Sequence, residues 1–368
     1  MRTQAVVHLD RLKRNIERTL ALLPEGTSLI AVLKGDAYGH GIAGVFPVFK
    51  DLGIKDFAVS VLEEGKALRE AGAEDESILL LGDTPDEMQG EVVRYRLTQT
   101  IYDADAAEKL NEKAEKAGVI QPIHIKIDTG MSRLGFFPES CLEPVKRIAA
   151  MKNLKITGAF THFMCADDPA DKRTEEQLSL FLKTVDILRE NGVEIPKIHI
   201  ANSPAALLWP KARSLDAVRS GDLLFGLNPI DNEGWKKSGY EEVMSWETVA
   251  AMVKTVPAGR DVGYGATYTT SEETVIVTVP VGFADGYSRS LSNKGFAVIN
   301  GVLCPIIGRV CMDQFMVDAS DAGEVRRGDR IELLGEAFGI LDMADLMGIN
   351  VDEIVCGIGK RVPRIYKK

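Results

Sequence analysis

The sequence predicts an N-terminal (β/α)8 barrel followed by a C-terminal, mostly antiparallel β-domain. Short apolar runs alternate with amphipathic helical patterns, and eight such units fit into about the first 225 residues, as in a (β/α)8 barrel. Beyond about residue 228 the runs become short and β-rich, with Gly and Asn-Gly turns between them. We therefore expect a barrel domain at 1–230 and a β-domain at 231–368, with a polar connection over 231–240.

The elements follow in chain order from these patterns. A short strand at 4–9 comes first, and Asp10 can cap a helix that reaches Leu23. The barrel strands are expected at 28–34, 57–61, 77–82, 98–102, 122–128, 154–162, 197–202 and 214–220. Amphipathic helices between them include 63–71, 103–117, 139–151 and 172–190. An open doubly wound sheet is the alternative, but no G-x-G-x-x-G follows the first strand.

Composition excludes several classes of function. The net charge is −10 and Lys and Arg form no cluster, so nucleic-acid binding is not expected. We see neither a signal peptide nor a run of about 18 apolar residues, which favours a cytoplasmic protein without a membrane segment. The five cysteines show no C-x-x-C spacing, so neither a disulfide scaffold nor a zinc site is expected. No His and carboxylate spacing indicates any other metal site.

One lysine stands out in the stretch SLIAVLKGDAYGHG. An apolar run delivers Lys34 to a glycine-rich turn that carries Tyr38 and His40. Lysine is rarely buried without a partner or a function, and a desolvated amine has a lowered pKa and can form a Schiff base. Seen alone, the stretch favours a strand-end lysine that reaches solvent.

Other strand ends carry polar side chains that would meet at the same end of the barrel. In PIHIKIDTG the isoleucines share one face, so Lys126 points inward, and the following loop brings Arg133, a carboxylate clamp. The next three strands end in groups that donate hydrogen bonds: His162, then His199 with Ser203, then Arg219 with Gly221 and Asp222. The Ser220-Gly221 turn can present backbone N–H groups to a phosphate, which predicts a phosphorylated ligand. Taken singly, these are ordinary surface cations or core histidines.

The second domain carries a tyrosine-bearing turn, VGYGATY, which contains Tyr264. Tyrosine with its ordinary pKa of about 10 is a poor base, but a nearby cation such as Arg289 would stabilise its phenolate. An ordinary turn aromatic is the alternative reading.

Together these segments resemble a known family. The motifs VLKGDAYGHG, IDTGMSRLGF, THF, ANSPA, RSG…FGLNP, VGYGATY, VGFADG, IGRVCMDQFMVD and RVPRIY resemble the alanine racemases, in that family's order, from Ala5 to Tyr366. The resemblance implies a (β/α)8 barrel with a β-domain, pyridoxal 5′-phosphate as cofactor, and interconversion of L- and D-alanine, which supplies D-alanine for peptidoglycan.

The resemblance also implies roles for individual residues. Lys34 would hold the cofactor covalently, and Arg133 would hold a cofactor oxygen and the substrate carboxylate. Lys126 matches a lysine that family members can carry as a carbamate. The phosphate would be contacted by Tyr38, Ser203, Gly221 and Asp222, and the pyridine nitrogen would face Arg219, with His162 and His199 around it.

Racemisation removes a proton from one face of Cα and returns one to the other, which suits two bases. By resemblance, Lys34 serves the D-side and Tyr264 the L-side. In the family this tyrosine and the methionine matched by Met312 come from the partner subunit, so a head-to-tail homodimer with shared sites is implied.

Three departures from the family pattern affect the pocket. Phe283 replaces a tyrosine in GYADG, Asp352 stands where many members have a tyrosine that touches the phosphate, and Asp222 stands where an apolar residue is usual. A carboxylate repels a phosphate and donates no hydrogen bond unless it is protonated. These changes keep a serine or broad-specificity racemase as the alternative function. A non-catalytic cofactor-binding barrel protein and a related diamino-acid decarboxylase are the alternatives from other classes.

Overall fold

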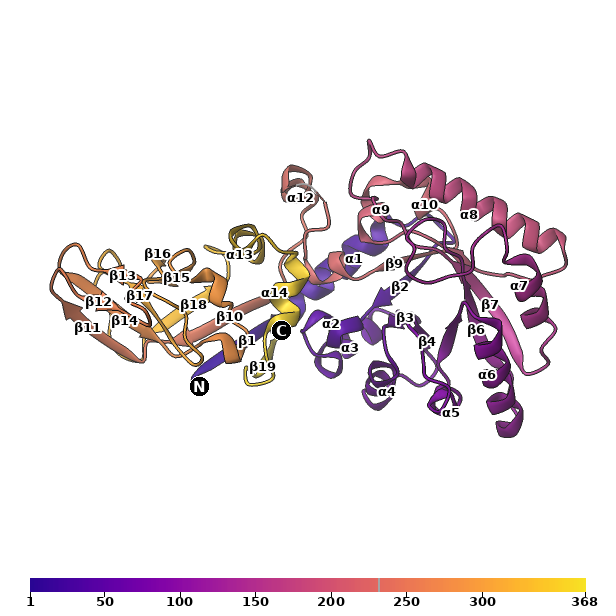
Figure 1. Ribbon diagram of the computed structural model, residues 1–368, viewed down its shortest axis with the longest axis horizontal. Helices are drawn as coiled ribbons and strands as arrows, with labels where there is room; N and C mark the ends of the chain where they lie inside the picture. The colour runs from indigo at the N-terminus through magenta and orange to yellow at the C-terminus, as the bar shows by residue number, and fades with distance from the viewer. Residues whose placement is uncertain (231) are drawn as a thin grey trace.

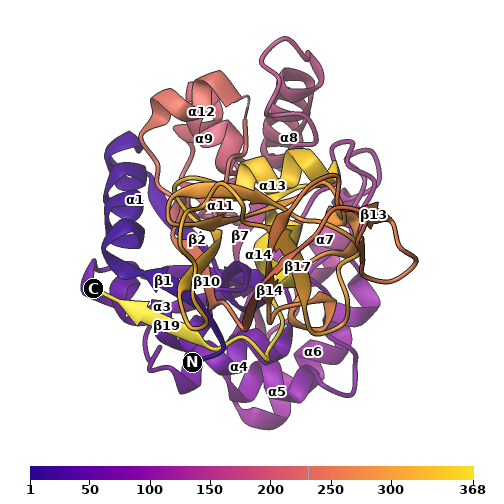
Figure 2. The same ribbon diagram turned by 90° about the vertical axis from the view of Figure 1, so that its left-hand side faces the viewer.

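The computed structural model describes residues 1–230 and 232–368 and has two lobes arranged end to end (Figure 1). The barrel forms one lobe and a β-rich domain forms the other. Seen along the long axis, the β-rich lobe lies in front of the barrel (Figure 2). Asp231, the first residue of the expected second domain, lies outside the described residues.

Eight parallel strands close into a barrel, and their hydrogen bonds run from each strand to the next and from the last back to the first. This confirms the predicted barrel, because each expected strand range overlaps one of the eight strands. The strands are β2 (Ser28–Val32), β3 (Asp56–Val59), β4 (Ser77–Leu80), β5 (Thr98–Ile101), β6 (Gln121–Lys126), β7 (Leu154–Phe160), β8 (Ile198–His199) and β9 (Ala217–Ser220).

Helices surround the barrel, and local sequence signals begin and end them. In α6 (Ala104–Ala117), the Asp103 carboxylate accepts from the backbone N–H of Asp105 and of Ala106, at 2.8 and 2.9 Å. The helix ends at Gly118 in the left-handed conformation. The other helices of this lobe are α1 (Leu9–Leu22), α2 (Lys34–Tyr38), α3 (Ile42–Asp51), α4 (Leu62–Glu70), α5 (Gln89–Arg94), α7 (Leu142–Ala149), α8 (Arg173–Glu190), α9 (Ser203–Leu208), α10 (Pro210–Arg213), α11 (Asp222–Phe225) and α12 (Asn232–Ser238).

Alternation along β6 decides which side chains enter the barrel. Ile123, Ile125 and Ile127 are fully buried in an apolar cluster with residues of α6 and α7. Because successive side chains of a strand point to opposite faces, His124 and Lys126 point to the barrel interior. The strand therefore delivers a lysine to the inside of the barrel, as the pattern predicts.

The second lobe contains mostly antiparallel sheets, in agreement with the prediction. A six-stranded sheet has the order β16-β15-β18-β10-β1-β19, and smaller sheets join β11-β14-β17 and β12-β13. Its elements are β1 (Thr3–His8), β10 (Met244–Val249), β11 (Met252–Val256), β12 (Asp261–Val262), β13 (Tyr268–Thr269), β14 (Thr274–Val279), η1 (Phe283–Asp285), η2 (Arg289–Leu291), β15 (Phe296–Ile299), β16 (Val302–Pro305), β17 (Phe315–Asp318), β18 (Arg330–Leu334), α13 (Ile340–Met347), α14 (Val351–Gly357) and β19 (Arg364–Lys367).

The first strand of the chain belongs to this second lobe, which differs from the expected assignment of all residues 1–230 to the barrel. β1 pairs antiparallel with β10 and parallel with β19. Its residues Ala5, Val6 and Val7 are fully buried. This burial agrees with its place inside the six-stranded sheet, where it has a neighbouring strand on each side. The consequence is that the first and last strands of the chain lie side by side.

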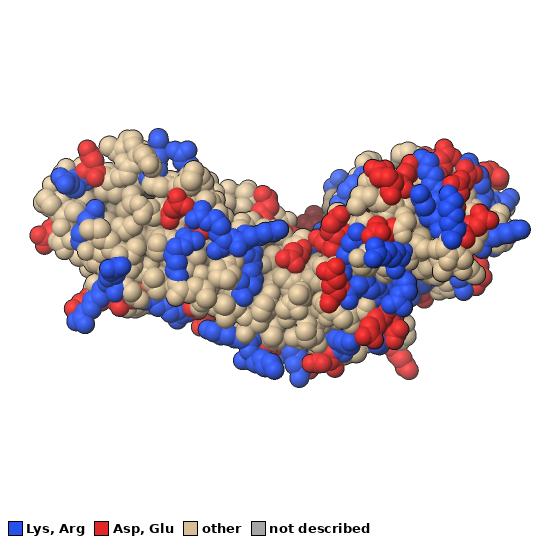
Figure 3. All heavy atoms as spheres, turned by 90° about the horizontal axis from the view of Figure 1, so that it is seen from below, with Lys and Arg blue, Asp and Glu red and all other residues tan. Residues whose placement is uncertain are grey.

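Charged side chains of both signs share the surface. On the face shown in Figure 3, Lys and Arg lie among Asp and Glu on both lobes. Because opposite charges separated by a few ångströms largely cancel at a distance in salt solution, this face offers no extended basic surface.

The junction between α11 and the second lobe is tightly packed. The Asn15 side chain of α1 donates to the Glu241 carbonyl at 2.8 Å and accepts from the Glu241 N–H at 3.0 Å. Gly226 ends α11 in the left-handed conformation, and a Cβ at this position would collide with the Glu241 carbonyl. Glycine is therefore needed at Gly226 for space as well as for conformation.

Replacing Gly226 should show how much this close approach contributes to stability. Gly118 has the same φ of 68°, but a Cβ there meets no atom within 4 Å. We expect Gly118→Ala to lower the free energy of unfolding by about 1 kcal/mol, the usual cost of the left-handed conformation. We expect Gly226→Ala to cost about 3 kcal/mol or more, because the collision adds to that cost. Urea unfolding of both variants measures the difference, and equal losses would contradict the packing described here.

Candidate active site

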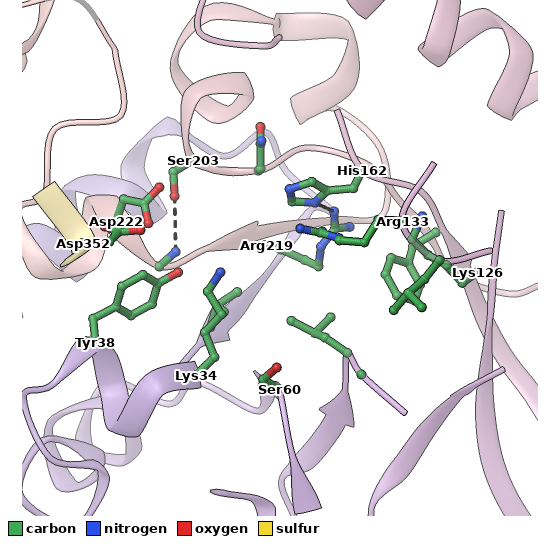
Figure 4. A pocket seen from close by; sticks show the side chains of 17 residues that line it. Lys34, Tyr38, Ser60, Lys126, Arg133, His162, Ser203, Arg219, Asp222 and Asp352 are labelled. Atoms are coloured by element: carbon green, nitrogen blue, oxygen red, sulfur yellow. Dashed lines mark hydrogen bonds between the residues drawn. The ribbon is translucent and has the colours of Figure 1, made fainter. Parts of the chain in front are cut away.

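A cavity of about 330 Å³ opens at the carboxyl ends of the barrel strands. Figure 4 shows its polar side chains converging from the barrel, the loops above it and α14 of the second lobe. The structure thus brings together many of the residues singled out from sequence, namely Lys34, Tyr38, Lys126, Arg133, His162, Ser203, Arg219, Gly221, Asp222 and Asp352. Ser60, Asn202 and Phe160 also line it and were not anticipated.

Lys34 begins a turn with an unusual backbone conformation. The four residues after it, 35–38, all have positive φ values, between 52° and 63°. Three of them are not glycine, and the left-handed conformation costs an L-residue about 1–2 kcal/mol. Contacts from elsewhere must therefore hold this turn, and with it the lysine, in place.

Glu64 of α4 holds the start of the turn. One carboxylate oxygen accepts from the N–H groups of Gly35 and Asp36 at 2.6 and 3.2 Å, and the other accepts from those of Ser60 and Val61 at 2.8 and 3.3 Å. No sequence pattern pointed to Glu64. An acidic residue in the first turn of a helix is common, so this position alone does not indicate that Glu64 binds the lysine turn.

The end of the turn is held by the C-terminal strand. Arg364 donates to the Gly39 carbonyl at 2.9 Å, and the Tyr366 hydroxyl donates to the His40 carbonyl at 3.0 Å. Inside the turn, Nδ1–H of His40 is shared between the carbonyls of Ala37 and Tyr38, each at 2.9 Å. Burial lowers the pKa of His40 to about 4, so this ring is neutral and structural.

Hydroxyl and backbone donors gather at one end of the cavity. The N–H of Gly221 donates to Ser203 Oγ at 3.2 Å, and that hydroxyl lies 3.3 Å from the hydroxyl of Ser220. A Cβ at Gly221 would collide with the Tyr38 hydroxyl, so the glycine lets the phenol approach the backbone. Burial and the Asp222 charge raise the pKa of Tyr38 well above its usual value, which keeps the phenol a proton donor.

Two carboxyl groups lie at this same end. Burial raises the pKa of Asp222, although the Lys34 charge and the Tyr38 hydroxyl act in the opposite direction. Burial and the Asp222 charge raise the pKa of Asp352 to about 7. Asp352 thus points toward the cavity that it lines and not away from it (Figure 4).

Arg219 occupies the opposite side of the cavity, and neutral acceptors surround it. Its guanidinium donates to Nδ1 of His199 at 2.7 Å, to Nδ1 of His162 at 3.1 Å and to the Thr161 carbonyl at 2.9 Å. Burial and the Arg133 charge lower its pKa to about 9, so it remains a cation at neutral pH. Within residues 1–230 and 232–368, no carboxylate forms an ion pair with it.

The histidines around Arg219 are neutral. Burial and the Arg219 charge hold the pKa values of His162 and His199 well below the usual range. Because Nδ1 of His199 accepts from Arg219, its Nε2 carries the proton and donates to Nδ1 of His124 at 3.0 Å. Two buried rings therefore fix the orientation of the guanidinium without neutralising its charge.

Lys126 lies near this arginine. Its Nζ donates to the Ile127 carbonyl at 2.9 Å and lies 5.5 Å from the centre of the Phe160 ring. Burial and the Arg219 charge lower its pKa to about 7. A substantial share of this amine is therefore uncharged at neutral pH.

Five of the predicted site residues do not line the cavity of this chain. His199 is buried behind it and accepts from Arg219. Tyr264, Phe283 and Met312 are 71%, 43% and 56% exposed on the second lobe, and Arg289 is exposed as well. Arg309 lies beside the tyrosine turn, because its guanidinium would lie 3.2 Å from a Cβ at Gly265. The action of Arg289 on this turn stays a prediction.

Every helix in the described part of the chain is too short or too polar to span a membrane. The same residues include no group of three or more His, Cys, Asp or Glu side chains arranged to bind a metal ion.

Comparisons with known proteins cover nearly the whole chain. Residues 7–229 match the family model described as alanine racemase, N-terminal domain, and residues 243–366 match alanine racemase, C-terminal domain. The alanine racemase of Clostridium tetani is 38% identical over an alignment of 368 positions, which covers 98% of this chain and 94% of that protein.

Solved structures agree with this match. The alanine racemase of Clostridium difficile 630 has a TM-score of 0.95 at 34% identity, over 100% of this chain and 96% of that one. The alanine racemase of Bartonella henselae with covalently bound pyridoxal phosphate has a TM-score of 0.91 at 27% identity, with all of both chains covered.

The lowered pKa of Lys126 predicts a pH-dependent stability. The ordinary pKa of this lysine is 10.5, so between about pH 7 and 10.5 the unfolded chain binds more protons than the folded chain. The free energy of unfolding must therefore rise with pH over this range. In CO₂-free buffer, we expect the wild type to gain about 1.4 kcal/mol per pH unit relative to Lys126→Met from pH 7 upward. Urea unfolding at several pH values measures this. Lys155→Met, an exposed lysine on β7, should follow the wild type, and a Lys126→Met curve parallel to both would contradict the assignment.

Proposed function

The chain belongs to the alanine racemase family and interconverts L- and D-alanine, and from this premise we propose how its residues perform the reaction. In our proposal the barrel cavity binds pyridoxal 5′-phosphate at Lys34, and Tyr264 of a second copy of the chain completes the site. The observation that carries the proposal is one cavity that holds a strand-end lysine between phosphate donors and a buried arginine that is a cation at neutral pH. The serine or broad-specificity alternative is not favoured, because the full-length relatives are alanine racemases.

The match to both family models also bears on the alternatives from other classes. A non-catalytic cofactor-binding barrel would resemble the barrel alone, whereas this chain also matches the C-terminal domain over 243–366. A decarboxylase of diamino acids would belong to a different family, whereas 98% of this chain aligns with an alanine racemase. We therefore retain neither.

The residues of the cavity suit the proposed cofactor. Tyr38, Ser203 and the N–H of Gly221 offer neutral donors to its phosphate, and Lys34 offers an amine to its aldehyde. When bound, pyridoxal phosphate supplies an electron sink that stabilises negative charge at Cα of the substrate. Arg219, a cation surrounded by neutral histidines, would face the ring nitrogen and would give it no proton. This weakens the sink and favours simple reprotonation of Cα over side reactions.

Arg133 would orient the substrate. Its guanidinium lines the cavity, and a planar fork binds both oxygens of a carboxylate at once. With the carboxylate fixed, the Cα–H bond can be directed toward one base or the other. We propose that the amine of Lys34 exchanges the proton on the D-side.

A second base is required on the L-side, and two titratable groups of the cavity are unsuited to this role. The phenol of Tyr38 is held protonated by its raised pKa, and Nδ1 of His162 is occupied by Arg219. We propose Tyr264 for this role, with Arg309 beside its turn as the cation that favours the phenolate.

The proposed homodimer would place Tyr264 at the cavity of a partner. Tyr264, Phe283 and Met312 are large and exposed on the second lobe of one chain. Backbone hydrogen bonds join the last two segments, from the Phe283 N–H to the Cys311 carbonyl at 3.1 Å and from the Ala284 N–H to the Met312 carbonyl at 3.0 Å. Exposed apolar side chains held together in this way are typical of a surface that binds another protein. We propose that a head-to-tail contact between two copies covers it.

We further propose that Lys126 is carbamylated. Its neutral amine attacks CO₂, an N–C bond forms, and one proton is released to solvent, which leaves an anion in place of the amine. The charges of Arg133 and Arg219 both act on Lys126 and would stabilise that anion. A carbamate would thus supply the acidic partner that the arginines lack.

The proposed cellular role follows from the product. D-alanine is a building block of peptidoglycan, and we propose that the enzyme supplies it in the cytoplasm. The five cysteines, none of them in a disulfide, suit a reducing compartment.

Mixed dimers test whether the site is shared. Lys34→Ala and Tyr264→Phe should each lose nearly all racemase activity when purified alone. If each site takes Lys34 from one chain and Tyr264 from the other, a mixed dimer of the two variants has one intact site. Random re-association should then restore about one quarter of the wild-type activity per chain, because half of the dimers are mixed and half of their sites are intact. The rate at which L-alanine is converted to D-alanine measures it, and no recovery after mixing would contradict the shared site.

Carbon-13 NMR tests the carbamate. With ¹³C-labelled bicarbonate, the wild type should show a carbamate carbonyl signal that is missing in Lys126→Met. The exposed Lys155→Met is the matched control and should keep the signal. A spectrum that is the same for wild type and Lys126→Met would refute carbamylation.

A further inference from the structure

Asp222 and Asp352 form a wall at the phosphate end of the cavity. Asp222 begins α11 of the barrel lobe and Asp352 lies in α14 of the second lobe, and both line the main cavity (Figure 4). Both also line a neighbouring cavity of about 480 Å³, on whose far side Asp345 and Asp167 lie. The two carboxyl groups therefore separate the proposed cofactor site from a second, polar cavity.

The charges that face this pair come from every element packed around it. Lys34 of α2 is the cation that acts on both carboxyl groups, and the Tyr38 hydroxyl of the same turn lies near them. Cys356 of α14 adds a thiol, and the charges of both carboxyl groups and of Glu64 of α4 act on it. Oδ1 of Asp352 is buried without a hydrogen-bond partner among the described residues.

A phosphate bound beside this pair meets an electrostatic conflict. A phosphate monoester carries about −1.5 to −2 charges at neutral pH, and two ionised carboxylates at hydrogen-bond range would repel it strongly. By the proposed function Lys34 is also engaged by the cofactor, so its ammonium no longer compensates the pair. Protonating one carboxyl group removes a negative charge and creates a donor, which an ionised carboxylate lacks.

We propose that Asp222 and Asp352 take up one proton when the cofactor phosphate binds, and that the shared proton is donated to a phosphate oxygen. This inference rests on the proposed function, because it assigns the phosphate to this end of the cavity. At these two positions, where neutral side chains are usual in the family, this chain has two carboxyl groups whose charge depends on pH. Cofactor binding is then coupled to pH in this chain.

The sign of the coupling follows from the proton balance. The complex holds one proton more than the free protein and ligand, so affinity must rise as pH falls. At low pH the pair is already protonated in the free chain, so the affinity does not depend on its proton. Above about pH 7 the pair must take up the proton on binding, and Kd then changes by at most about tenfold per pH unit.

Calorimetry with pyridoxine 5′-phosphate tests the proposal, because this analogue has the phosphate but no aldehyde and so does not react with Lys34. The full chain, freed of cofactor and checked for folding by circular dichroism, is titrated at about pH 8 in buffers of different ionisation heat. These heats give the number of protons taken up. We expect the wild type to take up about one proton more per ligand than Asp352→Asn or Asp222→Asn. Proton uptake by the ligand itself is the same in each protein and cancels.

Two further variants make the test specific. Asp345 lines the neighbouring cavity and not the main one, so Asp345→Asn should take up as many protons on binding as the wild type. Asp352→Tyr supplies a neutral donor and should bind about tenfold or more tightly than the wild type near pH 9. It also serves if the asparagine variants fail to fold. Equal proton uptake and parallel pH profiles in wild type, Asp352→Asn and Asp352→Tyr would overturn the inference.

A separate measurement distinguishes this inference from the proposed function. Pyridoxal 5′-phosphate should give an absorption change with the wild type that is missing in Lys34→Ala. If that change occurs but no variant alters the proton uptake, only the role of the aspartate pair is wrong. If it does not occur at any pH between about 6 and 9, the cofactor site is wrong and this inference fails with it.

Discussion

The left-handed turn after Lys34 is the constraint on which the rest of the site depends. Its backbone conformation is unfavourable for L-residues, and distant groups hold it: Glu64 at its start, Arg364 and Tyr366 at its end. Because Arg364 and Tyr366 lie on β19, and β19 pairs with β1, the first and last strands of the chain both support the lysine. The second lobe thus positions the barrel's lysine in addition to carrying Tyr264.

Charge is distributed unequally across the cavity. Lys126, Arg133 and Arg219 lie on one side, whereas Asp222 and Asp352 lie at the other end beside Lys34. Arg219 keeps its charge because its ring acceptors are neutral, so the field at that side is positive and fixed. Such a cavity accepts a ligand with a carboxylate in only one orientation, and it accepts a phosphate at the opposite end only after a proton has neutralised part of the acidic pair.

Residues shared with the family and residues particular to this chain have separate effects. The lysine, the arginines and the tyrosine turn follow the racemase pattern over the full length, and racemisation of alanine follows from them. Asp222 and Asp352 depart from that pattern at the phosphate end of the cavity, beside Lys34. They would alter how tightly, and at which pH, the cofactor is held while the reaction itself is unchanged.

The sequence by itself determined the barrel, the order of its strands, and the strand ends that carry Lys34, Lys126, Arg219 and their neighbours, because a strand's period and its end are local properties of the chain. Only the tertiary structure decided which sheet β1 joins, that Glu64 and β19 hold the lysine turn, and that Arg309 lies beside the tyrosine turn. These features depend on groups far apart in sequence, and no local pattern specifies which buried edge or backbone N–H such a group will reach. The pairing of Asp222 with Asp352 belongs to the same class: each carboxylate is visible in the sequence, but their shared cavity is formed by two lobes.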